Sequence, residues 1–142
     1  MRTPRISSSV SLALVAGSLA IGGCGDDAES TSEEAEHSAS PETALAEVGE
    51  TQKGLNEALA TYAEGDEAAA AEAVQETYLQ HFELVEGPLE EVEPELTEEL
   101  EDAIREELVE SMEAGDPVED VTALVEDITA DLGDASKALQ GS

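Results

Sequence analysis

The fold is decided by the stretch VEDVTALVEDITADLGDASKAL, residues 118–139. Its apolar side chains recur at steps of three and four residues, which places them on one face of an α-helix. They are Val118, Val121, Val125, Ile128, Leu132, Ala135 and Leu139, with Leu124 flanking that face. Just upstream, Asp116 can cap the helix and Pro117 suits its first position. The stretch therefore predicts an amphipathic helix that covers a core.

Three more stretches with the same periodicity precede this one. The first has a helix start at Ser40 and Pro41, and the second has one at Asp66. The residues that share one face are Leu45, Val48, Gln52, Leu55, Leu59 and Tyr62 in the first helix, Val74, Tyr78, Phe82 and Val85 in the second, and Leu96, Leu100, Ile104, Leu108 and Met112 in the third. Each stretch is long enough for several helical turns, so four helices are expected in all.

Glycine and proline separate these helices. Gly65 can end the first helix, and Ala114-Gly115 the third. Gly87-Pro88 predicts an end or a kink in the second, because proline lacks the amide donor, with a short apolar segment, Leu89 to Val92, before Pro94. No stretch alternates with a period of two, as a half-buried strand does. Short connections place consecutive helices antiparallel, so the sequence predicts an all-α, up-down-up-down four-helix bundle over residues 42–141.

The beginning of the chain is typical of an exported protein. Arg2 and Arg5 precede an uncharged apolar run, residues 10–21, that is too short to cross a bilayer. The run ends in Ile21-Gly22-Gly23-Cys24, which resembles the lipobox of bacterial lipoproteins. That resemblance implies a cleaved signal peptide, residues 1–23, and a lipid on the sulfur of Cys24. The alternative is an ordinary signal peptide followed by one free cysteine.

Residues 24–41 contain no Leu, Ile, Val or aromatic side chain, and they are rich in Asp, Glu and Ser. Such a segment cannot bury enough apolar surface to offset the entropy of ordering it. We therefore expect a disordered acidic linker that joins the lipid anchor to the bundle. The protein is then extracytoplasmic and lipid-anchored to the cell membrane, on the periplasmic side or at the cell surface.

The composition excludes several functions. The chain has 36 acidic and 5 basic residues and a formal net charge of −31, so nucleic acid is not an expected partner. No serine lies in a nucleophile elbow and no glycine-rich phosphate loop is present. The predicted bundle has one histidine, His81, which cannot build a histidine-based zinc site. We expect no enzyme activity.

The densest group of ligand-capable side chains lies in the second helix. Glu83 and Glu86 are three residues apart and share a helix face, near Tyr78 and His81. Glu101 could add an oxygen from the next helix. Carboxylates with one imidazole favour a hard cation such as iron, calcium or manganese. In a chain this rich in glutamate the same spacing also arises on a solvated face, so both interpretations stay open.

The predicted bundle also resembles a known family, over about residues 43–140. The shared positions are Tyr62-Ala-Glu-Gly-Asp66, Tyr78, Phe82-Glu83-Leu-Val-Glu86-Gly-Pro-Leu89, Pro94-Glu-Leu96, Glu101 and Gly115. The family is the extracytoplasmic helical domain attached to bacterial high-affinity iron permeases. The resemblance implies that Glu83, Glu86 and Glu101 are functional acids and that iron is the favoured cation. The permease's Arg-Glu-Gly-Leu-Glu motif is absent from this sequence, so the expected role is to bind a cation or to assist a permease.

A second hypothesis belongs to a different class of protein. The acidic residues are spread over all four predicted helices rather than gathered in one place. This distribution is also what an acidic structural or interaction lipoprotein of the cell envelope, with no specific ligand, would have.

Overall fold

The structure is a computed structural model that describes residues 39–142. The predicted signal peptide, the predicted lipidation site Cys24 and nearly all of the predicted linker lie outside the described residues. Within residues 39–142 there are helices and turns and no strand, which confirms the all-α prediction. In this part of the chain, no helix combines the length and the apolarity needed to cross a membrane.

Eight helical segments follow one another along the chain. They are α1 (Pro41–Ala63), α2 (Glu67–Thr77), the π-helical segment η1 (Tyr78–Phe82), α3 (Glu83–Glu90), α4 (Pro94–Asp102), the π-helical segment η2 (Ala103–Leu108), α5 (Val109–Ala114) and α6 (Val118–Gly141). Because α2, η1 and α3 are continuous, they form one long helix, called here the second bundle helix. In the same way α4, η2 and α5 form the third bundle helix, while α1 and α6 are the first and the fourth.

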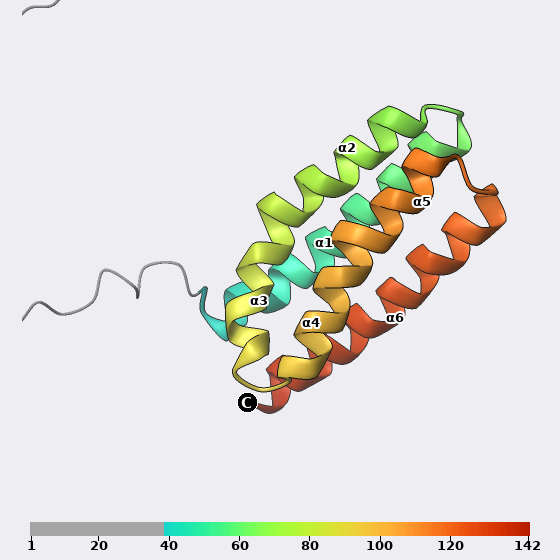
Figure 1. Cartoon of the computed structure of the whole chain (residues 1–142). Helices are drawn as coiled ribbons and strands as arrows, with labels where there is room; N and C mark the ends of the chain where they lie inside the picture. The colour runs from blue at the N-terminus through green and yellow to red at the C-terminus, as the bar shows by residue number, and fades with distance from the viewer. Residues whose placement is uncertain (1–38) are drawn as a thin grey trace, which may run out of the picture. The chain divides into compact units, whose positions relative to one another are not determined.

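The four bundle helices lie side by side with alternating direction, as Figure 1 shows. The first packs against the second and the fourth, and the third packs against those same two from the other side. Short turns at residues 64–66, 91–93 and 115–117 connect them. This arrangement is the predicted up-down-up-down four-helix bundle.

The predicted apolar faces meet in the middle of the bundle. Val121, Val125, Ile128, Leu132 and Leu139 of α6 are buried, and so are the predicted apolar residues of the second bundle helix. Leu45, Leu59, Leu96 and Leu124 lie at the edge of the core and are partly buried. Val118, by contrast, is 45% exposed because it is the first residue of α6 and lies beyond the packed turns.

Two predicted helix starts and two predicted ends are present. Ser40 caps α1 by accepting a hydrogen bond from the Thr43 amide at 3.2 Å, and Asp66 caps α2 in the same way. Gly65 and Gly115 follow α1 and α5 with φ of 94° and 70°. This left-handed conformation is cheap for glycine, which has no Cβ, so these two residues end their helices.

The predicted cap of the fourth helix is wrong in detail. Pro117, with φ of −52°, stands at the cap position, and α6 begins one residue later at Val118. The Asp116 carboxylate instead accepts a hydrogen bond from the Ser111 hydroxyl at 2.8 Å. The Asp116 carbonyl accepts one from the Tyr62 hydroxyl at 2.6 Å, which ties this turn to the end of α1. Tertiary hydrogen bonds therefore take Asp116 away from the capping role.

The second helix also continues beyond the predicted break. Pro88 lies inside α3, which runs to Glu90, so Leu89 belongs to this helix rather than to a separate segment. Pro88 and Leu89 are both buried. Burial of these two side chains favours the helical conformation enough to offset the hydrogen bond that proline cannot donate.

The two π-helical segments were not predicted. Each holds five or six residues in a wider turn, η1 in the second bundle helix and η2 in the third. A wide turn shifts the rotational phase of every residue that follows it, and such turns are common at functional sites. Tyr78 begins η1 and Arg105 lies in η2, and these two residues contact each other.

Candidate cation site

The predicted ligand Tyr78 occupies the centre of the site. It lies at the start of η1, where its ring is buried and packs against Phe82 with a centroid distance of 5.6 Å. Its hydroxyl donates a hydrogen bond to Oε1 of Glu86, in α3. The buried ring and the hydrogen bond together fix the position of the Glu86 carboxylate at the edge of the core.

Glu101 approaches from the third bundle helix. Nη1 of Arg105 donates to Oε1 of Glu101 at 2.5 Å, one helical turn away. The same guanidinium lies over the Tyr78 ring, with its carbon 5.1 Å from the ring centroid. Tyr78 therefore links two carboxylates from different bundle helices. Its hydroxyl binds Glu86, and the face of its ring contacts the Arg105 guanidinium, which binds Glu101.

Burial and the neighbouring charges shift the pKa of Glu86. Partial burial raises the pKa of the Glu86 carboxyl above its usual value, and the nearby charges of Glu101 and Glu83 raise it further. The hydrogen bond from Tyr78 and the charge of Arg105 act in the opposite direction. Burial and the Glu86 carboxylate raise the pKa of Tyr78, so its hydroxyl keeps its proton and acts as a donor. A positive charge placed here would favour the ionised form of Glu86.

An acidic depression adjoins the two carboxylates. It has a volume of about 360 Å³ and lies between the end of α3 and the start of α4. The lining side chains are Glu86, Glu90, Pro94, Thr97, Glu98 and Glu101. Four of the six are glutamates and none is basic, so the potential in the depression is negative and attracts cations.

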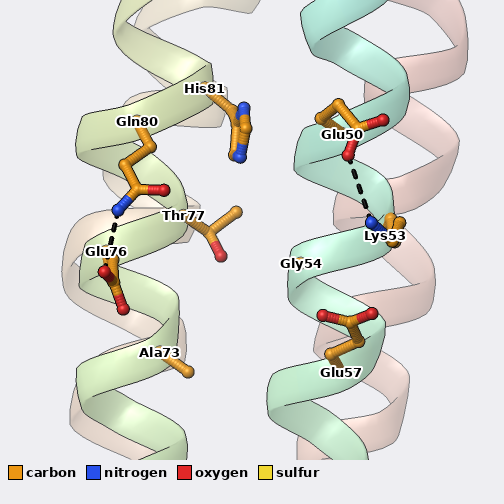
Figure 2. A pocket seen from close by; sticks show the side chains of 9 residues that line it. All are labelled: Glu50, Lys53, Gly54, Glu57, Ala73, Glu76, Thr77, Gln80 and His81. Atoms are coloured by element: carbon orange, nitrogen blue, oxygen red, sulfur yellow. Dashed lines mark hydrogen bonds and ion pairs between the residues drawn. The ribbon is translucent and has the colours of Figure 1, made fainter.

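His81 lies elsewhere. Its Nδ1 is 2.7 Å from Oε2 of Glu47 in α1, and the pair is partly buried. It also lines a second depression, of about 250 Å³, between α1 and the second bundle helix. In Figure 2 its ring points from the second bundle helix toward α1, in line with Thr77 below it. The structure therefore brings Tyr78, Glu86 and Glu101 together, with Glu83 close to Glu86, and places His81 in another group.

The donor atoms of the site are of the chemical type that hard cations prefer. Glu86 and Glu101 offer carboxylate oxygens, the ligands that calcium, magnesium, manganese and iron accept. Within residues 39–142, no three acidic or histidine side chains converge closely enough to hold a metal ion. A cation held here would have two protein carboxylates, and water would supply the remaining ligands, as is common for magnesium.

Two residues of these groups were not among the predicted ones. Arg105 reaches Tyr78 and Glu101, and Glu47 reaches His81. Arg105 could have been noticed because it stands four residues after Glu101, a spacing at which helical side chains form ion pairs. Glu47 carries no such signal, because it lies 34 residues before His81.

The bundle and its acidic depression define the class of protein as a strongly acidic four-helix domain. Comparison of the chain with protein-family models, with curated proteins and with solved structures finds no match.

Proposed function

We propose that this protein is a lipid-anchored extracytoplasmic protein whose bundle binds a hard cation, with iron favoured, or assists an iron permease in doing so. The observation that carries the proposal is the position of Glu86. Its carboxylate is partly withdrawn from water beside Glu101, which makes an added positive charge favourable there.

The chemistry of the depression supports the same proposal. Oxygen donors bind ferrous or ferric iron, manganese and calcium, whereas softer metals prefer sulfur or nitrogen. The Tyr78 hydroxyl keeps its proton and orients Glu86 rather than binding the cation itself. Glu83, Glu90 and Glu98 add negative charge around the two carboxylates.

The anchor rests on the sequence pattern that ends at Cys24. Several acyl chains hold a protein on a membrane lastingly, at about 0.8 kcal/mol per buried methylene. We expect Cys24→Ser to move the protein from the membrane fraction to the soluble extracytoplasmic fraction, with the helical circular dichroism unchanged. Retention of the variant in the membrane fraction would contradict the lipid anchor.

Calorimetry tests the cation site. The chain from Gly25 to Ser142 is titrated with ferrous iron under anaerobic conditions, and with Mn²⁺ and Ca²⁺, in 0.3 M NaCl to screen diffuse attraction. The double variant Glu86→Gln/Glu101→Gln should lose the binding. The matched control is Glu110→Gln, an exposed acid in α5 of the third bundle helix, which should bind like the unmodified chain. Equal binding by all the proteins would refute a specific site.

A second candidate function follows from a different observation. Exposed acids lie on every bundle helix, and the described residues hold no closed group of three metal ligands. An acidic envelope lipoprotein that docks a basic partner, without a specific ligand, would have this surface. Copurification of one protein with the detergent-extracted chain, lost in high salt, would favour this function over cation binding.

A further inference from the structure

Leu79 is an exposed leucine on the second bundle helix. It belongs to η1 and follows the buried Tyr78, and it is 60% exposed, more than any other large apolar side chain of residues 39–142. A single exposed leucine is common on protein surfaces. This one stands out because it separates two hollows whose lining side chains differ in charge.

One hollow holds a base and the other holds acids. The first, called here the Arg105 hollow, has a volume of about 260 Å³ and is lined by Gln75, Tyr78, Leu79 and Arg105. The second, called here the Glu76 hollow, has a volume of about 400 Å³ and is lined by Glu72, Gln75, Glu76, Leu79 and Gln80. Gln75 and Leu79 line both hollows, so these two side chains form an uncharged ridge between them.

The two hollows lie on opposite sides of this ridge. Arg105 belongs to η2, so the Arg105 hollow lies toward the third bundle helix. Glu76 and Gln80 also line the depression beside α1 (Figure 2), so the Glu76 hollow lies toward the first bundle helix. Across this face, the side chains therefore change from a base, through an uncharged ridge, to acids.

A surface with this layout is complementary to a copy of itself. When two copies face each other across a two-fold axis parallel to the second bundle helix, the two sides of the ridge exchange places. Leu79 of one copy then meets Leu79 of the other at the axis, and each Arg105 lies opposite Glu76 of the other copy. An axis perpendicular to the helix would instead place Arg105 against Arg105, so charge favours the parallel arrangement.

Arg105 can make such a contact and keep the one it has. Its Nη1 donates to Glu101, but a guanidinium has five N–H donors, and this side chain is 54% exposed. The formal net charge of −31 opposes self-association. Two copies can therefore meet most easily where an uncharged ridge and a base lie side by side, as they do at Leu79.

We propose that the face formed by this ridge and its two hollows is an interface between two copies of the chain, with their second bundle helices parallel. Parallel helices place Ser40 of both copies, where α1 begins, at the same end of the dimer. Two chains held on one membrane by the anchor proposed at Cys24 can then associate without either of them turning over. The dimer requires no bound cation.

Cysteine crosslinking in membranes tests the position of the axis. Leu79→Cys in the full chain should form a disulfide-linked dimer under mild oxidation, because a residue on a two-fold axis meets its own copy. Val118→Cys is the matched control, since Val118 is also exposed but lies on α6, and it should stay unlinked. The unmodified chain, treated in the same way, reports any link through Cys24. Equal linking of the two variants, no linking of Leu79→Cys, or its linking to a different protein would each refute the interface.

Light scattering of the full chain, extracted in detergent at about 0.3 M NaCl to screen net repulsion, measures the dimer directly. The protein mass should rise from one chain to two with concentration, and Leu79→Glu should weaken the dimer at least about tenfold. Because Leu79 is exposed, its helical circular dichroism should not change. A mass of one chain up to about 0.5 mM would refute the proposal.

Charge reversal tests the contact of Arg105 with Glu76. Arg105→Glu should weaken dimerisation about tenfold, and adding Glu76→Arg should restore it, because opposite charges again face each other. Adding Glu110→Arg makes the same change in net charge on α5 and should not restore it. Recovery in both double variants, or in neither, would refute the charge arrangement. These measurements use no metal, so they stand or fall separately from the proposed cation site.

Discussion

The two depressions beside the second bundle helix are both lined by several glutamates, yet they differ in kind. The one at Glu86 and Glu101 has no basic lining residue, and its central carboxylate is partly withdrawn from water. The one in Figure 2 contains Lys53, which pairs with Glu50, and His81, which pairs with Glu47. The number of acids alone therefore does not distinguish the two depressions. Partial burial of Glu86 distinguishes the two, because a base pairs with an acid at both places, Arg105 with Glu101 and Lys53 with Glu50.

Helix packing also differs at the two places. Gly54 of α1 lies against Thr77 in the lining of the second depression, and a Cβ at Gly54 would clash with the Thr77 hydroxyl oxygen. The backbones approach closely there because the glycine has no side chain. Near the first depression, by contrast, two large side chains meet between the second and third bundle helices, the buried ring of Tyr78 and the half-exposed guanidinium of Arg105.

The largest effect on stability is expected from adding a side chain at Gly54, where the two backbones lie close together. Gly54→Ala should lower the free energy of unfolding by about 1–3 kcal/mol, because Thr77 or a helix must shift. Urea denaturation followed by circular dichroism measures the change. The control is Gly49→Ala in the same helix, where a Cβ meets nothing within 4 Å and should stabilise by up to about 1 kcal/mol.

A rescue variant completes this test. Thr77→Ala removes the two nearest atoms, the hydroxyl oxygen and the methyl carbon. Gly54→Ala/Thr77→Ala should therefore recover most of the stability that Gly54→Ala loses. If Gly54→Ala were as stable as the unmodified chain, the close packing of α1 on the second bundle helix would be wrong.

The next effect concerns the cations themselves. Glu86→Gln should weaken Mn²⁺ binding about tenfold, since one of two carboxylate ligands is lost. Glu76→Gln, in the second depression, removes the same charge from an exposed acid and should leave the binding unchanged. The comparison is made by calorimetry at two salt concentrations. High salt screens the diffuse attraction of Mn²⁺ to exposed acids much more than it weakens direct binding to a partly buried carboxylate. Equal losses in both variants would erase the distinction between the depressions.

Much of the bundle follows from local sequence. The three- and four-residue spacing of Val121, Val125 and Ile128 determines which face of α6 is buried, and Ser40 and Asp66 cap helices through bonds to amides three residues ahead. These effects act within a turn or two of helix. They can be predicted because no distant residue is needed to produce them.

The site depends on longer-range geometry. The π-helical segments rotate the residues after Tyr78 and Ala103, and no residue type in the sequence marks them. The contact of Arg105 with Tyr78 requires two separate helices in the correct rotation, and the pair of His81 with Glu47 requires a third. Spacing thus predicted the acids Glu83 and Glu86 as candidates, while Glu101 was expected from its place on the next helix and from the family resemblance. It could not predict that His81 would face a different neighbour.

A third prediction concerns pH. The folded state raises the pKa of Glu86, mainly through burial, so the folded chain binds its proton more tightly than the unfolded chain does. Ionised Glu86 therefore destabilises the fold when the pH is above its raised pKa. This destabilisation disappears as the pH falls from the pKa of the folded chain to the lower pKa of the unfolded chain. Glu86→Gln should be more stable than the unmodified chain at high pH and should lose that advantage in acid. Metal-free urea denaturation at several pH values measures the difference, and a difference that does not vary with pH would contradict the burial of Glu86.

The smallest effect tests whether removing the base is enough to create a site. Lys53→Gln leaves the second depression with Glu50, Glu57 and Glu76 and no lysine, so its lining comes closer to that of the first, which has four glutamates. These three acids are exposed, and water already solvates them, so a cation gains little by replacing that water. We expect Lys53→Gln to change the overall Mn²⁺ affinity by less than about twofold in calorimetry and to add no second binding step. A new step as tight as the first would mean that the lack of a basic lining residue, rather than the partial burial of Glu86, makes the proposed cation site. Burial is the stronger cause because a carboxylate that has already lost part of its water gives up less when a cation takes its place.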